Sequence, residues 1–385
     1  MPTTKLFYQD CHIRTFCATI IGCQKAKNGW HITLNATAFY PEGGGQPCDL
    51  GTLGNANVLD VREQGEEILH LCDAPLEIGE TVEGNVHWER RFDLMQQHTG
   101  EHILSGLLHR KFGCHNVGFH IGSDCMEVDF DCSPTREDLM EIEAEANEVI
   151  WRNFPVKCWY PAQTELPDIP YRSKKALNYP VRLVQIPDVD SCACCGVHTA
   201  ATGEVGMLKI LSATKFHQGV RLEVVCGNRA YRYFSALLEQ GKQVSQAFCA
   251  KLLEIGNAAE KMNDTLAAEK LRANTLQGQI FDYIADSYAH QVQIVHFSSD
   301  LTSAQVRQLA DKLANKAEKF AAVLAGNDSD GYHFCLAARN QDLRPLGKAF
   351  TAQCHGRGGG KPEFQQGSVL ATAGDIRAFL DNYVL

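Results

Sequence analysis

Alternating hydrophobic and polar positions predict a β-rich segment over residues 1–89. Short alternating runs, such as the one at residues 31–34, are separated by glycine and asparagine clusters at residues 27–29 and 53–55. A period of two marks a strand with one buried face, and Gly or Asn between such runs marks a turn. The segment is therefore predicted to form a small antiparallel barrel or sandwich.

Residues 90–227 combine helical and strand patterns. Apolar residues and two histidines recur at helical spacings from about Asp93 onward, and a second helix is predicted over residues 134–153. Residues 181–186 and 219–226 are predicted to be strands. This part of the chain is expected to form an α+β domain.

The remaining chain is predicted to contain a long helical segment and a further α/β unit. Residues 228–283 lack proline and repeat apolar residues at spacings of three, four and seven. That pattern indicates a long helix or helical hairpin with coiled-coil character, and it suits a dimer seam as well as ordinary core packing. A homodimer through this connector or the C-terminal unit is therefore permitted. Residues 284–385 are predicted to contain strands at 294–297 and 321–325, helices at 302–320 and 373–383, and a loop at 354–361.

The fold class predicted for the 385 residues is α+β, in four parts. These are a β-barrel-like domain, an α+β domain, a helical connector and a C-terminal α/β domain, at residues 1–89, 90–227, 228–283 and 284–385.

Composition narrows the class of protein. The net charge of −10 argues against indiscriminate nucleic-acid binding, although local basic patches can still hold RNA. Neither a signal peptide nor an apolar stretch of about 18 residues is recognisable, so no membrane association is expected. The sixteen cysteines lack regular spacing, and we interpret them as reduced thiols of a cytoplasmic protein.

Two short motifs supply a full set of zinc ligands. His98 and His102 lie four residues apart on the first predicted helix, where they share one face, and Cys194 and His198 have the same spacing in a glycine-containing turn. Three imidazoles and one thiolate match tetrahedral zinc, so one Zn²⁺ per chain is expected if the motifs meet. Four protein ligands are usual for a closed structural site, whereas a replaceable ligand would let zinc lower the pKa of bound water to about 7. The spacing of the ligands is compatible with both a structural and a catalytic zinc site.

Other polar residues near these motifs are expected to play lesser parts. Cys192 and Cys195 are close enough in sequence to compete for the metal, but packing is the favoured role. Glu101 stands about 100° around the helix from His102, so it is not expected to be the general base.

A glycine-rich motif is the second chemical signal. Gly43, Gly44 and Gly45 expose backbone N–H groups and let a substrate approach closely, and Gln46 adds a neutral donor and acceptor. Thr37 precedes this turn and supplies a hydroxyl. Together with the metal motifs, the turn indicates a substrate site.

The combination resembles the alanyl-tRNA editing (AlaX) family, in its long form, and the editing region of alanyl-tRNA synthetase. The resemblance spans nearly the whole chain and rests on five stretches, at residues 37–46, 88–105, 194–206, 219–223 and 356–362. The last is similar to the Gly-rich loop of the C-terminal DHHA1 module. The family usually reads Cys-Gly-Gly-Thr-His where this chain has Cys195 and Val197 in place of the first Gly and the Thr, which puts the local turn in doubt but not the ligands.

The resemblance implies trans-editing: zinc-dependent hydrolysis of mischarged tRNA(Ala), chiefly seryl-tRNA(Ala), with glycyl-tRNA(Ala) as a second substrate. It implies that His98, His102, Cys194 and His198 hold zinc in an editing domain at residues 90–227. Thr37 and Gln46 are assigned to catalysis and side-chain recognition, and the substrate-binding assignments are Gly43, Gly44, Gly45 and Arg221. A site that hydrogen-bonds a substrate hydroxyl can discriminate by about 10⁴, where a merely apolar pocket reaches about 10².

Basic residues are the candidates for holding the tRNA. They are Arg172, Lys174 and Lys175, which lie in a run without acidic residues, and Arg357 and Lys361 in the DHHA1-like module. A glycine-rich backbone beside Arg357 suits RNA phosphates.

Two alternatives remain open. The chain could be a tRNA-binding protein whose zinc is purely structural, or a deacylase for another aminoacyl-tRNA such as threonyl-tRNA, which also bears a hydroxyl. Because the chain begins directly with the β-rich segment, neither an upstream ATP-binding catalytic domain nor ATP is expected.

Overall fold

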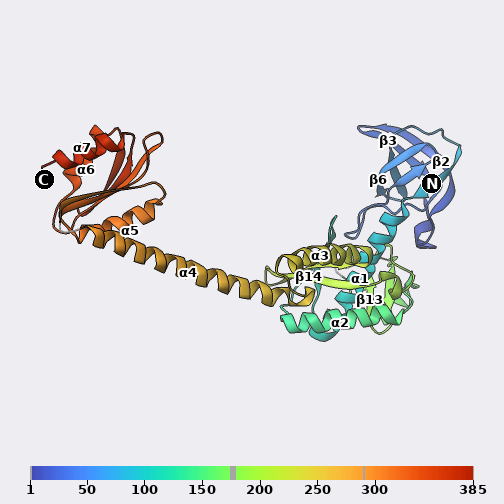
Figure 1. Cartoon of the computed structure of the whole chain (residues 1–385). Helices are drawn as coiled ribbons and strands as arrows, with labels where there is room; N and C mark the ends of the chain where they lie inside the picture. Colours follow the sequence, from blue (N-terminus) through green and yellow to red (C-terminus); the bar gives the residue numbers. More distant parts are fainter. Residues whose placement is uncertain (1, 174–178, 289–290, 385) are drawn as a thin grey trace. The chain divides into compact units, whose positions relative to one another are not determined.

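A computed structural model describes residues 2–173, 179–288 and 291–384. The chain divides into two compact units, Met1–Gln243 and Val244–Leu385, and each is described by itself (Figure 1). Helices occur in both units, with several separate sheets in the described part of the first unit and one five-stranded sheet in the second, so the class is mixed α+β. The predicted division into four domains stays a prediction.

The first unit begins with a closed six-stranded barrel, whose strands follow the order β2-β3-β7-β6-β5-β8. Alternating burial along strands such as β7 places every second side chain inside, as a period of two requires. The strands are β2 Thr15–Ala26, β3 Gly29–Leu34, β5 Gly51–Leu53, β6 Ala56–Gln64, β7 Glu67–Cys72 and β8 Thr81–Val86. The short strands β1 Thr4–Lys5 and β4 Ala36–Thr37 pair in parallel, and the 3-10 helix η1 Leu6–Tyr8 follows β1.

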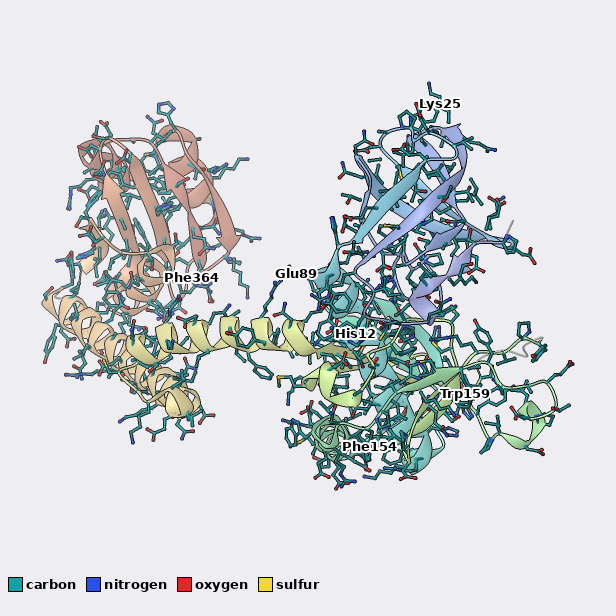
Figure 2. The ribbon with its side chains drawn as sticks, turned by 90° about the vertical axis from the view of Figure 1, so that its right-hand side faces the viewer. His12, Lys25, Glu89, Phe154, Trp159 and Phe364 are labelled. Carbon is teal, nitrogen blue, oxygen red and sulfur yellow. A yellow bond between two sulfur atoms is a disulfide. The ribbon has the colours of Figure 1, made fainter. Side chains whose placement is uncertain are left out.

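Helix α1, Trp88–Phe112, connects the barrel to the second core of this unit. Its Met95 is buried in the barrel core, whereas Ile103 and the leucines of the following turns are buried in the second core. The helix starts five residues before the predicted Asp93. Figure 2 shows Lys25 at the end of the barrel away from Glu89, which lies in the first turn of α1.

Two sheets, helix α2, most of helix α3 and the 3-10 helices η2 and η3 complete the described part of this unit. A four-stranded antiparallel sheet has the order β14-β15-β10-β9, and a three-stranded sheet has the order β11-β12-β13. The elements are β9 Asn116–Ile121, β10 Met126–Phe130, α2 Arg136–Arg152, β11 Lys157–Trp159, η2 Leu166–Asp168, β12 Leu183–Ile186, β13 Asp190–Ala193, η3 Thr202–Val205, β14 Leu208–Phe216, β15 Gly219–Cys226 and α3 Gly227–Ala247. Thr135 caps α2 in a capping box with Asp138.

The second unit consists of a long helix followed in sequence by an α/β module. Its sheet has the order β16-β17-β18-β20-β19, and only β16 and β17 pair in parallel, with α5 as the crossover. The elements are η4 Leu252–Glu254, α4 Ile255–Ser287, β16 Gln291–Ser298, α5 Ser303–Ala314, β17 Ala317–Asn327, β18 Gly331–Ala337, α6 Arg344–Gln353, β19 Arg357–Lys361, β20 Phe364–Val369 and α7 Ala373–Asn382.

Three expectations about local structure need correction. The predicted helix at 302–320 ends at Ala314, because residues 317–320 begin strand β17. The predicted loop at 354–361 contains an edge strand, β19, which pairs with β20. The expectation that all cysteines are reduced is wrong for Cys114 and Cys132, which form a disulfide between the end of α1 and the end of β10.

Within the described parts of the chain, no helix combines the length and apolar character needed to cross a membrane. The cytoplasmic location stays a prediction.

Candidate metal centre

The structure brings the two predicted metal motifs together. His98 and His102 lie one turn apart on α1, with ring centroids 5.5 Å apart. The β12–β13 hairpin ends beside this helix, and the loop that follows β13 carries Cys194 and His198. One potential ligand atom from each of these four residues lies within 4.8 Å of all the others.

The distances and the donor set fit a tetrahedral ion. Zinc bonds of about 2.0–2.3 Å place neighbouring ligand atoms roughly 3.3–3.8 Å apart, and His98 Nε2 lies 3.4 Å from Cys194 Sγ. His198 Nε2 is buried and has no hydrogen-bond partner. A buried polar atom without a partner is costly in a folded protein, and a metal ion would supply one here. The four side chains therefore fit one Zn²⁺.

The protonation states of these groups favour ligation. Burial raises the pKa of the Cys194 thiol, but His98, His198 and a hydrogen bond with His102 outweigh this, so the pKa lies well below its usual value. Burial, followed by the charge of His98, lowers the pKa of His198 to about 3. Burial lowers the pKa of His102 too, but hydrogen bonds with Asp190 and Cys194, together with the charges of Cys194 and Glu101, outweigh burial and raise the pKa well above its usual value. Metal binding would displace that proton, because a ligating imidazole is neutral.

A second set of residues holds the far nitrogen of each imidazole. His98 Nδ1 donates to Gln46 Oε1 at 2.8 Å, and His102 Nδ1 lies 2.8 Å from Asp190 Oδ2. The Thr99 hydroxyl lies 3.5 Å from His198 Nδ1. Because a partner on Nδ1 fixes both the tautomer and the ring orientation, the Nε2 atoms are left for the metal.

The glycine motif acts by positioning Gln46. Gly43 N–H donates to the Gln46 carbonyl oxygen and Gln46 N–H donates back, at 3.1 and 3.0 Å, which closes a two-residue hairpin. Gly44 and Gly45 have φ of 58° and 82°, and such a turn requires positive φ at both central residues. The Gln46 side chain then accepts from the Val197 backbone N–H at 3.2 Å as well as from His98.

The loop that carries Cys194 is held against α1 by its own close contacts. Arg182 donates to the carbonyl oxygens of Cys194 and Gly196 at 3.0 and 2.8 Å. The Gly196 backbone N–H donates to Cys194 Sγ at 3.3 Å. A Cβ atom on Gly196 would lie 2.1 Å from His98 Cε1, so only glycine lets the loop approach the imidazole. Val197 is buried in the barrel core, whereas Cys195 is exposed.

A cavity of about 140 Å³ adjoins the metal group. His98, His102 and Cys194 line it, together with Gly44 and Glu101. Glu101 Oε2 lies 3.8 Å from His102 Nε2, the nitrogen that faces the metal group. Although Glu101 lies about 100° around the helix from His102, its carboxylate therefore reaches the site. Glu101 and Asp190 are the polar residues that sequence reasoning missed, although the four-residue spacing of Asp190 and Cys194 along the hairpin is a weak signal.

Other predicted site residues occupy different surroundings. The Thr37 hydroxyl is buried in the barrel, 2.8 Å from His70 Nε2, and it accepts from the Phe39 backbone N–H. Arg221 on β15 pairs with Asp129 on the neighbouring strand at 2.7 Å. Neither Thr37 nor Arg221 lines the cavity beside the metal group.

The predicted tRNA contacts also differ in their surroundings. The side chain of Arg172 is 16% exposed and pairs with Asp190 at 2.8 Å, so its charge is already matched within the chain. Arg357 and Lys361 are exposed at the two ends of edge strand β19. Lys174 and Lys175 lie outside the described residues.

A further metal-compatible group shares a residue with the first. His102, Asp190 and Cys192 satisfy the same distance condition. Asp190 already holds His102 through Nδ1, as an outer carboxylate does in zinc sites. Cys192 thus stands beside the centre as a buried thiol, whose pKa burial raises to about 11.

Comparisons with known proteins agree with the family resemblance of the sequence. The family described as the threonyl and alanyl tRNA synthetase second additional domain matches residues 181–222, and the DHHA1 domain matches residues 289–383. The alanyl-tRNA editing protein Aarsd1 of Danio rerio is 25% identical over 97% of this chain and 96% of its own length. The mouse protein of the same name is 26% identical, with 98% of each chain covered.

Both of these relatives are named alanyl-tRNA editing protein, and each is similar to this chain over nearly its whole length. The predicted resemblance and the predicted DHHA1 module are thereby confirmed. Alanine–tRNA ligases match as well: that of Pyrobaculum arsenaticum is 30% identical over 98% of this chain. The chain spans less than half of the length of that ligase, 44%, so the match covers only part of it.

Proposed function

We propose that this chain is a zinc-dependent deacylase that hydrolyses mischarged tRNA(Ala) in trans, chiefly seryl-tRNA(Ala), with glycyl-tRNA(Ala) as the second candidate. One observation carries the proposal. A group of three histidines and one cysteine adjoins a cavity, and three of these four residues line it. Two relatives named alanyl-tRNA editing protein align with this chain over nearly the whole length of both proteins. This similarity supports aminoacyl-tRNA(Ala) as the substrate class and hydrolysis outside a synthetase.

The reaction breaks the ester bond between the amino-acid carbonyl carbon and the ribose oxygen of the terminal nucleotide. Water supplies an oxygen to the carbonyl carbon, and the ribose oxygen leaves with a proton. Zinc, when bound, acts as a Lewis acid and lowers the pKa of coordinated water to about 7.

This chain's own residues prepare the site for that chemistry. Gln46 and Asp190 fix the rings of His98 and His102, so that little reorganisation is needed during the reaction. Glu101 stands at the cavity wall, 3.8 Å from His102 Nε2, where a carboxylate can hold or pass a proton. Gly44 lines the cavity, where its lack of a side chain would leave room for a small acyl group.

A purely structural zinc site is the main competing function. Four protein ligands are typical of closed sites, and a protein of that kind would bind tRNA without cleaving it. The cavity next to the ligands favours a site that admits substrate. A threonyl ester is the second competitor, because it carries the same hydroxyl.

One experiment separates these functions. The protein is incubated with seryl-, glycyl-, alanyl- and threonyl-tRNA, with and without chelator, beside His102→Ala. We expect rapid release of serine, slower release of glycine and little release of alanine, with loss of all three after chelation. The control is His87→Ala, an exposed histidine of the same region that is outside the metal group. Folded, zinc-loaded protein without hydrolysis would assign the metal a structural role, and preference for the threonyl ester would reassign the substrate.

A further inference from the structure

A second group of metal-compatible side chains lies on the turn that follows η1. Asp10, Cys11 and His12 are consecutive, and one potential ligand atom from each lies within 4.8 Å of the other two. The ring of His12 lies beside Trp88 at the start of α1 and contacts the 3-10 helix η3, where the barrel meets the second core (Figure 2). None of the three residues belongs to the first metal centre, which is formed by His98, His102, Cys194 and His198.

The contacts of this turn converge on one nitrogen of His12. Its Nδ1 atom lies 3.4 Å from Cys11 Sγ and 3.7 Å from Asp10 Oδ1. Both distances fall within the roughly 3.3–3.8 Å that separate neighbouring ligand atoms of a tetrahedral zinc ion. Imidazole nitrogen, thiolate sulfur and carboxylate oxygen are all zinc ligands, and three of them leave a fourth position for water.

A carboxylate from a distant segment holds the ring of His12. Glu204 Oε2, on η3, lies 3.0 Å from His12 Nε2, although the two residues are 192 positions apart in the chain. With its proton on Nε2, the imidazole donates to Glu204 and leaves Nδ1 for a metal. Asp190 stands behind His102 in the same way at the first metal centre, with the roles of the two ring nitrogens exchanged.

The charges around the turn favour a cation. The side chains of Asp10 and Glu204 are 60% and 28% exposed, so both carboxylates are accessible from solvent. After burial, their charges are the main causes that raise the pKa of Cys11 to about 11. Arg91 donates to the Cys11 carbonyl oxygen at 3.4 Å, but its charge is matched by buried Asp49. The field at the thiol is therefore negative, and it attracts a cation.

An ordinary polar turn is the competing interpretation. Asp10 Oδ1 accepts from the His12 backbone N–H at 2.8 Å, which is the usual hydrogen bond of an Asx turn. That bond explains the position of the carboxylate. It does not explain why the thiol and the imidazole face the same oxygen, or why a carboxylate from η3 orients the imidazole.

We propose that Asp10, Cys11 and His12 form a second metal site that binds a divalent cation such as Zn²⁺, with Glu204 as the outer carboxylate. The site has three protein ligands and is more exposed than the first metal centre. It therefore binds its ion more weakly, and dialysis that leaves zinc in the first metal centre empties it.

An ion at this turn would also support the first metal centre. Tyr8, two residues before Asp10, donates through its hydroxyl to the Cys195 carbonyl oxygen at 2.5 Å. The guanidinium of Arg182 lies over the Tyr8 ring, 4.3 Å from its centroid, and the same arginine donates to the Cys194 carbonyl oxygen. Fixing the turn to η3 would therefore hold the residue against which the Cys194 loop packs.

Cobalt reports the second site while zinc occupies the first. Full-length protein is loaded with zinc, dialysed and titrated with Co²⁺. A tetrahedral site of imidazole and thiolate ligands suits zinc, so the first metal centre keeps its ion, and zinc content is measured before and after the titration. We expect one Co²⁺ per chain and a thiolate-to-cobalt charge-transfer absorption band.

Four variants identify the ligands. Cys11→Ser should abolish the charge-transfer band, because no thiolate remains at the site. Glu204→Gln should weaken cobalt binding by about tenfold, as is typical for an outer carboxylate, and His12→Asn should weaken it further. Cys17→Ser is the matched control, since Cys17 is an exposed cysteine of the same barrel and lies outside the metal-compatible groups. It should bind cobalt as the wild type does.

Two results would overturn the site. One is the absence of a band in the wild type at up to about 1 mM cobalt, a concentration that reveals even weak binding. The other is a band that survives in Cys11→Ser. If that surviving band disappears in Cys194→Ser, the cobalt has entered the first metal centre instead.

Thermal unfolding provides an independent readout. A cation that binds only the folded state raises the melting temperature by mass action. Added Co²⁺ should therefore raise the melting temperature of zinc-loaded wild type and Cys17→Ser, but not that of Cys11→Ser or His12→Asn. Equal increases in all four proteins would also overturn the site. Neither readout depends on hydrolysis, so the second site can fail while the proposed function holds, and the reverse.

Discussion

Asp190 Oδ2 lies 2.8 Å from His102 Nδ1, with both side chains almost fully buried. The other oxygen of this carboxylate accepts from Arg172 Nε at 2.8 Å. An ion pair thus stands behind a candidate metal ligand, and it links the ligand to the wall of the cavity beside the metal group.

This relationship predicts that Asp190→Asn weakens zinc binding by about 10- to 100-fold, because the carboxylate orients His102 and raises its basicity. The measurement is the zinc dissociation constant by competition with a chelator. Asp188→Asn is the matched control, since Asp188 is exposed, two residues away, and has a positive φ that asparagine tolerates. Equal zinc affinities for the two variants would show that Asp190 does not support metal binding and that its ion pair with Arg172 is purely structural.

Gly196→Ala should abolish stable zinc binding. The added Cβ would fall 2.1 Å from His98 Cε1, so either the imidazole or the Cys194 loop must move. Zinc content per chain, measured by atomic spectroscopy after dialysis, should drop from one to near zero. Gly359→Ala, where a Cβ meets no atom within 4 Å, should keep its zinc. A fully loaded Gly196→Ala protein would show that His98 is not a ligand.

Acid should destabilise the barrel through His70. Burial is the main cause that lowers the pKa of His70 to about 4, so the folded state holds it neutral while the unfolded state takes a proton below about 6.5. Stability from this group is therefore present above pH 6.5 and is lost as the pH falls towards 4. Between pH 7.5 and 5 the loss is about 2 kcal/mol. Because buried His198 loses stability over the same pH range in both proteins, urea unfolding at both pH values should show a loss that is larger in the wild type than in His70→Gln by this amount, and equal losses in both proteins would contradict it.

Thr37→Val should lower the free energy of unfolding by about 1–3 kcal/mol, because it removes the hydroxyl that lies 2.8 Å from buried His70. Thr37→Ser keeps an oxygen there and should restore most of the stability. The family resemblance predicts a second effect, a smaller ratio of seryl- to alanyl-tRNA deacylation in Thr37→Val. Loss of stability with an unchanged ratio would assign the hydroxyl to the barrel alone.

Arg357→Ala should weaken tRNA binding and reduce its salt dependence by about one phosphate contact. Arg357 is exposed at one end of β19, and nearby glycines leave the backbone accessible. Affinity is measured at several salt concentrations, with Lys348→Ala on α6 as the charge-matched control. Identical slopes for Arg357→Ala and the wild type would remove this strand from the tRNA interface.

Much of the fold follows from local patterns. Strand β15 covers the same residues, 219–226, that are predicted as a strand, and α7 begins at the predicted Ala373. Strand β19 escaped prediction because Arg-Gly-Gly-Gly-Lys has no apolar alternation, and only the ladder with β20 makes it a strand. The predicted helix of 302–320 was too long because the parallel pairing of β17 with β16 takes up its last residues.

The sequence alone identified the four candidate ligand residues, because the capacity to bind a metal depends on residue type and on a spacing of four, and both are local. Only the tertiary structure decided that Gln46 would reach His98 and that Asp190 would stand behind His102. It also placed Glu101 in the wall of the adjoining cavity and Glu204 beside His12. Those contacts join segments far apart in the chain, and their geometry comes from barrel closure and hairpin packing against α1, which no local pattern encodes.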